Sequence, residues 1–125
     1  MKIVYTDFWP DFDPETLPLT KIINSIAELE EVVDVENADF LLYSCMGQKH
    51  WLAPDDTIKI FYTGENMTPD FNACDYGIGY DWLEFGDRYL RFPLYYLYGD
   101  VCEQMENKHL VPMADVKKTK KTFAV

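Results

Sequence analysis

The sequence predicts an α/β fold in which a mostly parallel sheet is flanked by helices. Short apolar and β-branched stretches recur along the chain, as buried strands require. Helical periodicity follows the first of them, and strands that alternate with helical or loop crossovers are typical of this class. The chain has 125 residues, of which 48% are apolar, so it can bury the core of one domain.

The first elements are a strand, a loop and a helix. Residues 2–6 form an apolar stretch that suits a buried strand, and residues 7–14 hold two prolines among acids and aromatics, which indicates a loop. A helix then enters through Pro18. Its expected apolar face consists of Leu19, Ile22, Ile23, Ile26 and Leu29, which recur at helical spacing.

Four more strands are predicted downstream. Val32, Val33 and Val35 suggest the second strand, and residues 40–43, 58–63 and 76–80 suggest the third, fourth and fifth. Only residues 36–38 separate the second strand from the third, which is too short for an ordinary parallel crossover. Either that pair is antiparallel or one of the two assignments is wrong.

The segment from Leu94 to Tyr98 follows Pro93 and is rich in aromatic residues. It fits a helix or an extended segment equally well. Tyr95, Tyr96 and Tyr98 are expected to pack in the core rather than to contact a sugar.

The charge balance excludes some partners. The sequence has 11 basic and 22 acidic residues, and four of the lysines are clustered at 117–121. Because the remaining body repels phosphate backbones, we expect no nucleic-acid partner. The lysine cluster is expected to be a solvated linker, with contact to an anionic lipid surface as the alternative.

Location and metal content follow from what the sequence lacks. No apolar run reaches the length of a membrane-spanning helix and no secretory h-region follows Met1, so we expect a cytoplasmic protein. Cys45, Cys74 and Cys102 are widely spaced without a CxxC pair, and we expect reduced thiols and no metal. The DxD pattern at residues 11–13 is too short to change that expectation.

Two other groups of polar residues are expected to lie outside the functional site. His50 and His109 are isolated, and each is expected at the surface or at its boundary. Asp87, Arg88 and Arg91 are expected to form the ion pairs and hydrogen bonds that hold an irregular segment near Tyr89.

The chemistry is expected in the loops after the carboxyl ends of the strands. The loop at residues 7–10 follows the first strand, and the loop at 64–66 follows the fourth. If both strands are parallel, these loops share one edge of the sheet. Glu65 would then stand at the rim of a cleft and accept a proton from a bound hydroxyl, and Trp9 would stack on the apolar face of a sugar. On composition alone, Glu65 is an ordinary exposed carboxylate.

Several strings of residues resemble the amino-terminal domain of the α-1,3-fucosyltransferases of glycosyltransferase family 10. They are TDFWP at 6–10, YTGEN at 62–66, DFN at 70–72, CDY at 74–76, and GDRYLR with PLY at 86–95. The resemblance covers nearly the whole chain. The lack of an anchor is similar to the bacterial members of the family.

The resemblance implies a fold and a mechanism. The fold would be the Rossmann-like amino-terminal half of the two-domain GT-B arrangement, and the reaction would be inverting transfer of fucose from GDP-fucose to an N-acetylglucosamine-type glycan hydroxyl. The glutamate of the family's TGEN motif, the proposed general base, corresponds to Glu65. The resemblance also makes Asn66, Trp9, Asp7 and Asp70 candidates for binding the acceptor, and it implies no cofactor in this chain.

The resemblance also implies a division of the chain. Residues 1–112 correspond to the acceptor-side domain, and residues 113–125 look like a linker and the start of a donor domain. The chain therefore resembles half an enzyme that is inactive alone and completed by a missing or separate donor domain, with peripheral membrane association as an option for the complete enzyme. A truncated gene product, an engineered fragment and a subunit all fit. The alternative function is a non-catalytic saccharide-binding or assembly module.

Overall fold

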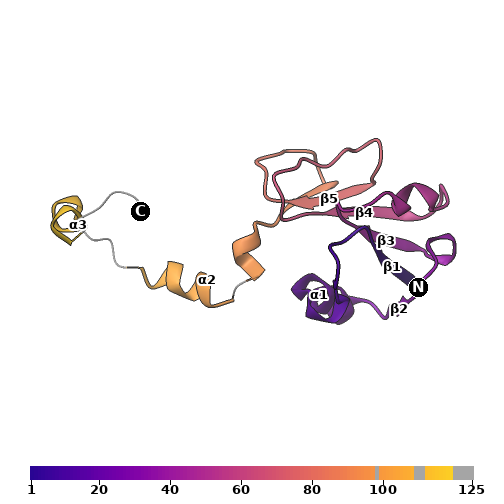
Figure 1. The fold of residues 1–125 in the computed structure, drawn as a ribbon, viewed down its shortest axis with the longest axis horizontal. Helices are drawn as coiled ribbons and strands as arrows, with labels where there is room; N and C mark the ends of the chain where they lie inside the picture. The colour runs from indigo at the N-terminus through magenta and orange to yellow at the C-terminus, as the bar shows by residue number, and fades with distance from the viewer. Residues whose placement is uncertain (98, 109–111, 120–125) are drawn as a thin grey trace.

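A six-stranded parallel sheet forms the centre of the computed structural model, which describes residues 1–97, 99–108 and 112–119. The strand order is β2-β1-β3-β4-β5-β6, and every neighbouring pair is parallel. The predicted α/β class and the parallel sheet are confirmed. Figure 1 shows α1 beside the sheet, whereas α2 and α3 lead away from it.

The elements have the following bounds. The strands are β1 (Lys2–Thr6), β2 (Glu30–Glu31), β3 (Phe40–Tyr43), β4 (Ile58–Tyr62), β5 (Tyr76–Gly79) and β6 (Tyr89–Arg91). The α-helices are α1 (Pro18–Ile26), α2 (Gly99–Glu106) and α3 (Met113–Thr119). Four 3₁₀ helices are η1 (Pro14–Thr16), η2 (Val35–Asn37), η3 (Lys49–Leu52) and η4 (Leu94–Leu97). No helix in the described ranges is long and apolar enough to cross a bilayer.

The sheet buries a core on each of its faces. Successive side chains of a strand point to opposite faces, so Leu41 and Tyr43 of β3 pack with Phe61 of β4 on one side. Leu42 of β3 packs with Tyr62 of β4 on the other. Leu41 and Leu42 are both fully buried, which explains why β3 is apolar throughout.

The second strand is not where its valines predicted it. β2 consists of Glu30 and Glu31 and pairs with β1, while Val33 is 93% exposed and Val35 begins η2. β1 also pairs with β3, so it lies between β2 and β3. The prediction failed because backbone pairing to β1, including the bond from the Val32 N–H to the Ile3 carbonyl, determines the strand rather than β-branched composition.

Helix α1 buries less of its apolar face than its periodicity predicted. Leu19 is buried and Ile23 packs against the same core, but Ile22 and Ile26 are 49% and 79% exposed. Leu19 and Ile23 lie four residues apart on one row, and the adjacent row with Ile22 and Ile26 faces away from the sheet. The helix ends at Ile26, so Leu29 follows it.

The segment near Tyr89 is a strand, β6, which the sequence did not predict. Arg88 precedes it and donates hydrogen bonds to the carbonyls of Phe71, Cys74 and Asp75. Its guanidinium also lies over the rings of Phe71 and Phe85. The predicted hydrogen-bonding role of Arg88 is therefore confirmed, whereas the ion pairs found among the described residues do not include Arg88.

The aromatic segment after Pro93 forms the 3₁₀ helix η4. Of the two predicted alternatives, a helix or an extended segment, the helix is therefore confirmed. Tyr98 lies outside the described residues, as do His109 and residues 120–125 of the expected donor-domain start. Lys117 and Lys118, expected in a linker, belong to α3. The Nζ atom of Lys118 forms an ion pair with Asp115 at 3.0 Å.

Candidate active site

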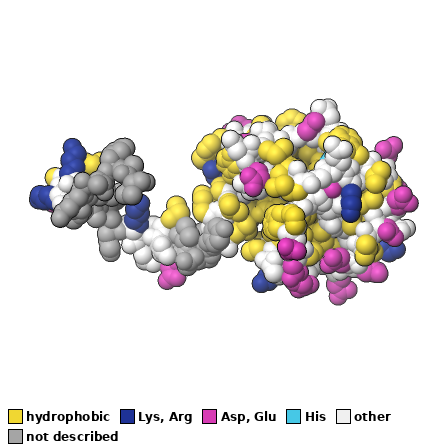
Figure 2. All heavy atoms as spheres, viewed as in Figure 1, with side chains coloured by type: hydrophobic (Ala, Val, Ile, Leu, Met, Phe, Trp, Pro, Cys, Tyr) yellow, Lys and Arg dark blue, Asp and Glu magenta, His cyan; other side chains and the backbone are white. Residues whose placement is uncertain are grey.

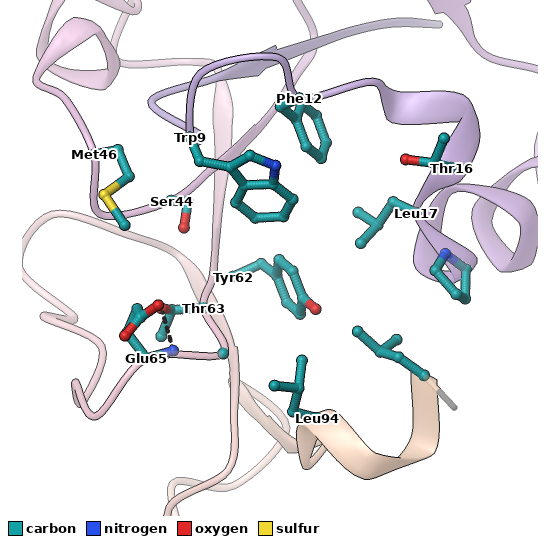
Figure 3. A pocket seen from close by; sticks show the side chains of 13 residues that line it. Trp9, Phe12, Thr16, Leu17, Ser44, Met46, Tyr62, Thr63, Glu65 and Leu94 are labelled. Atoms are coloured by element: carbon teal, nitrogen blue, oxygen red, sulfur yellow. Dashed lines mark hydrogen bonds between the residues drawn. The ribbon is translucent and has the colours of Figure 1, made fainter. Parts of the chain in front are cut away.

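A cavity of about 410 Å³ opens at the carboxyl edge of the sheet. We call it the first cavity. Its lining comes from the loops after β1, β3 and β4, from the start of α1 and from η4: Trp9, Phe12, Thr16, Leu17, Pro18, Ser44, Met46, Tyr62, Thr63, Gly64, Glu65, Leu94 and Leu97. The prediction that the loops containing Trp9 and Glu65 share one edge is therefore confirmed. Figure 3 shows Trp9, Tyr62 and Leu94 around the cavity and Glu65 beside Thr63 at one side.

Neighbouring aromatic rings hold Trp9 in place. Its indole packs edge-on against Phe8 and Phe12, with ring centroids 5.6 and 5.0 Å away. Phe8 and Phe12 stack on each other at 3.8 Å and anchor the loop to the core. Trp9 remains 46% exposed, so an apolar surface is held rigidly while part of it stays open to a ligand.

Glu65 lies on a short turn that Thr63 fixes. The Thr63 hydroxyl accepts a hydrogen bond of 3.0 Å from the Glu65 N–H, and the Thr63 side chain is fully buried. The backbone of Glu65 is thus anchored while its side chain is exposed at the cavity. The next residue, Asn66, accepts a hydrogen bond from the Tyr80 hydroxyl and is absent from the cavity lining.

Asp7 does not line the first cavity, and its side chain binds the segment around His50. Its carboxylate accepts hydrogen bonds from the N–H groups of Lys49 and His50, both at 2.9 Å, and lies 2.6 Å from His50 Nδ1. Burial raises the pKa of Asp7, but the His50 and Lys49 hydrogen bonds lower it more, so the net pKa lies below the ordinary value. Because an ionised carboxylate only accepts, Nδ1 carries the proton. The Asp7 carboxylate thus has partners within the protein, and its expected contact with the acceptor stays a prediction.

His50 is buried, contrary to the prediction of a surface or boundary position. It is 9% exposed and its ring stacks on Tyr43 at 4.2 Å. An isolated histidine in a sequence gives no sign of the distant carboxylate that makes its burial favourable. Here that partner, Asp7, lies 43 residues earlier in the chain.

Asp70 lies in a second cavity, of about 250 Å³, at the same edge of the sheet. This second cavity is lined by Tyr43, Ser44, Cys45, Gly47, Gln48, His50, Trp51, Phe61, Met67, Thr68, Asp70 and Ala73. One oxygen of Asp70 accepts hydrogen bonds from both nitrogens of Asn72. These bonds lower the pKa of Asp70. Of the predicted site residues, only Glu65 and Trp9 meet in the first cavity.

Sequence reasoning missed the rest of the first cavity. Ser44 and Met46 follow β3, which was predicted correctly, so the rule that assigned Glu65 could have found them. The rule could not have found Leu94 and Leu97, because they belong to η4 rather than to a loop at the end of a predicted strand. They reach the cavity only through tertiary packing. The DxD pattern has a structural role in part, since Asp13 caps η1 through a hydrogen bond of 3.0 Å from the Glu15 N–H.

The sequence and the fold both match known fucosyltransferases. The family described as "Alpha-(1,3)-fucosyltransferase FucT N-terminal domain" matches residues 3–98. Alpha-(1,3)-fucosyltransferase FucT of Helicobacter pylori is 66% identical over 38 residues, which are 30% of this chain and 8% of that protein.

Solved structures extend the match to the fold. A crystal structure of α1,3-fucosyltransferase is similar with a TM-score of 0.66 and 28% identity, over 96% of this chain and 37% of that one. A second, with GDP-fucose, gives a TM-score of 0.61 and 29% identity, over 96% and 35%. The chain thus spans about a third of the fucosyltransferases whose structures it matches. It belongs to the family of α-(1,3)-fucosyltransferase amino-terminal domains.

Proposed function

We propose that this chain is the acceptor-side domain of an inverting α-1,3-fucosyltransferase and that Glu65 is its general base. The observation that carries the proposal is the meeting of Glu65 and Trp9 in the first cavity. An exposed carboxylate beside a rigid aromatic surface suits a sugar, whose ring has an apolar face and whose rim carries hydroxyls. The acceptor we expect is an N-acetylglucosamine-type glycan.

The reaction divides between two domains. The Glu65 carboxylate takes the proton from the acceptor hydroxyl as that oxygen forms a bond to the anomeric carbon of fucose. The bond from that carbon to the diphosphate breaks at the same time, and GDP leaves with the electron pair. Attack opposite the leaving group inverts the anomeric centre. GDP-fucose is expected on a donor domain outside this chain, so the chain alone should not transfer fucose.

The test is kinetic and uses this chain joined to the donor domain of one of the solved fucosyltransferases. Glu65→Gln keeps the shape of the side chain but removes the basic oxygen, so kcat should fall about 100-fold or more. The acceptor KM should change little, because the lost interaction belongs to the transition state. Asn66→Ala should have a milder effect, through the turn that carries Glu65.

Glu84→Gln is the matched control, since Glu84 is an exposed carboxylate outside both cavities. It should leave kcat unchanged. Near-parental kcat for Glu65→Gln would refute the assignment of the base. Glycan binding without any turnover by the fusion would favour the alternative, a non-catalytic saccharide-binding module.

A further inference from the structure

The second cavity lies against the first across the end of the sheet. Ser44, directly after β3, lines both cavities. Along β4 and its loop the lining alternates, because Phe61 contributes to the second cavity and Tyr62 to the first. Since alternate residues of a strand face opposite sides of the sheet, the cavities lie on opposite faces and meet at its edge. A ligand that contacts both cavities must therefore cross the edge of the sheet and be longer than one sugar unit.

The second cavity repeats the chemistry of the first. Trp51 is 61% exposed, and its ring lies tilted against His50, with the centroids 4.9 Å apart. His50 is itself fixed by Asp7 and by stacking on Tyr43, so the support of the indole is rigid. Asp70, Thr68 and Gln48 supply exposed oxygen and amide groups around it. An aromatic surface ringed by hydrogen-bonding groups suits a second sugar.

We propose that the second cavity is a saccharide subsite, and that the acceptor is an oligosaccharide whose reacting sugar occupies the first cavity and whose next unit lies on Trp51. The inference rests on the proposed function of the first cavity. It identifies Trp51 as the anchor of the extended acceptor and Asp70 as a hydrogen-bond acceptor for its hydroxyls. It also gives the Asp7 and His50 pair a role, which is to position Trp51.

Calorimetric titration of this chain with two glycans tests the subsite. The probes are the monosaccharide N-acetylglucosamine, which fills only the first cavity, and the disaccharide N-acetyllactosamine, which adds the next unit. The disaccharide should bind the parent chain about tenfold more tightly, as expected for one added aromatic contact. Trp51→Ala should reduce that ratio to about one while the monosaccharide Kd stays unchanged. Asp70→Asn, which retains the oxygen that binds Asn72, should reduce the ratio less.

Trp82→Ala is the matched control, because Trp82 is 88% exposed and lines neither cavity. It should leave both dissociation constants unchanged. Thermal melting of each variant checks folding. Because Trp51 is largely exposed, Trp51→Ala should not unfold the chain. Equal affinities for the two glycans, or a ratio of affinities that Trp51→Ala leaves unchanged, would overturn the proposed subsite. Neither result would contradict the proposed function of the first cavity. Failure of the parent chain to bind either glycan would overturn both proposals.

Discussion

At the scale of single residues, Asp7 is the side chain that joins the loop after β1 to the segment around His50. Its side chain is 2% exposed, and it accepts from two backbone N–H groups as well as the His50 ring. Asp7→Asn replaces one acceptor oxygen with a donor and leaves buried groups unpaired, so the free energy of unfolding should fall by about 2–4 kcal/mol. Chemical denaturation at pH 7 measures this.

Asp11→Asn is the control for that substitution. Asp7 and Asp11 both have positive φ angles, 58° and 63°, and asparagine tolerates that conformation. Asp11 is exposed, so Asp11→Asn should change the free energy of unfolding by no more than about 0.5 kcal/mol. Equal effects at the two positions would contradict the importance of the buried carboxylate.

The lowered pKa of Asp7 also predicts a pH dependence. The carboxyl is more acidic in the folded chain than in the unfolded one, so the unfolded state binds protons first as the pH falls. The stabilisation is complete above the unfolded pKa of about 4 and is lost as the pH falls through the lower folded value. The free energy of unfolding should therefore drop more steeply below pH 4 in the parent than in Asp7→Asn. Parallel pH profiles would show that Asp7 contributes nothing to acid sensitivity.

At the scale of elements, a close contact joins β5 to the loop after β4. A Cβ atom on Gly77 would lie 2.6 Å from Cγ and 2.8 Å from Cβ of Pro69. Gly77→Ala should therefore destabilise the fold by about 2–3 kcal/mol through overpacking. Denaturant unfolding of Gly77→Ala, Pro69→Ala and the double variant tests the contact. Removing the proline ring should restore part of the loss, whereas strictly additive effects would place the cause elsewhere.

Gly86→Ala is the control for Gly77→Ala. Gly86 has a φ of 59°, and a Cβ atom there would meet nothing within 4 Å. Gly86→Ala should cost only the backbone strain, about 1 kcal/mol. A larger loss at Gly86 than at Gly77 would contradict packing as the dominant effect.

At the scale of the whole molecule, net charge affects stability. The formal charge is −11, and self-repulsion of like charges opposes the compact state. Salt screens this repulsion, so raising NaCl from about 0.01 to 0.15 M, which shortens the Debye length from about 30 to 8 Å, should raise the Tm. Figure 2 shows many of the acidic side chains along the right and lower margins of the part of the molecule that contains the sheet. A Tm that falls with salt would indicate that attractive pairs dominate instead.

The sequence predicted the central strands of the sheet but not its edge strands. β1, β3, β4 and β5 were found because continuous apolar runs are typical of strands buried on both faces. The edge strands β2 and β6 escaped, since two glutamates and a three-residue segment become strands only through pairing with their neighbours. Likewise, the rule for carboxyl ends of strands placed Glu65 and Trp9 correctly. It could not anticipate that Asp7 bonds to His50, because no local pattern encodes a pairing 43 residues apart.

One wall of the first cavity comes from η4, the segment through which the chain leaves the sheet. Leu94 also lies close to Gly64, where a Cβ atom would stand 3.1 Å from Leu94 Cδ1, next to Glu65. If the first cavity binds the acceptor as proposed, that binding and the placement of η4 are thermodynamically linked. An interaction that fixes η4 against the sheet would then raise the affinity for the acceptor, and by reciprocity a bound acceptor would favour the same placement of η4.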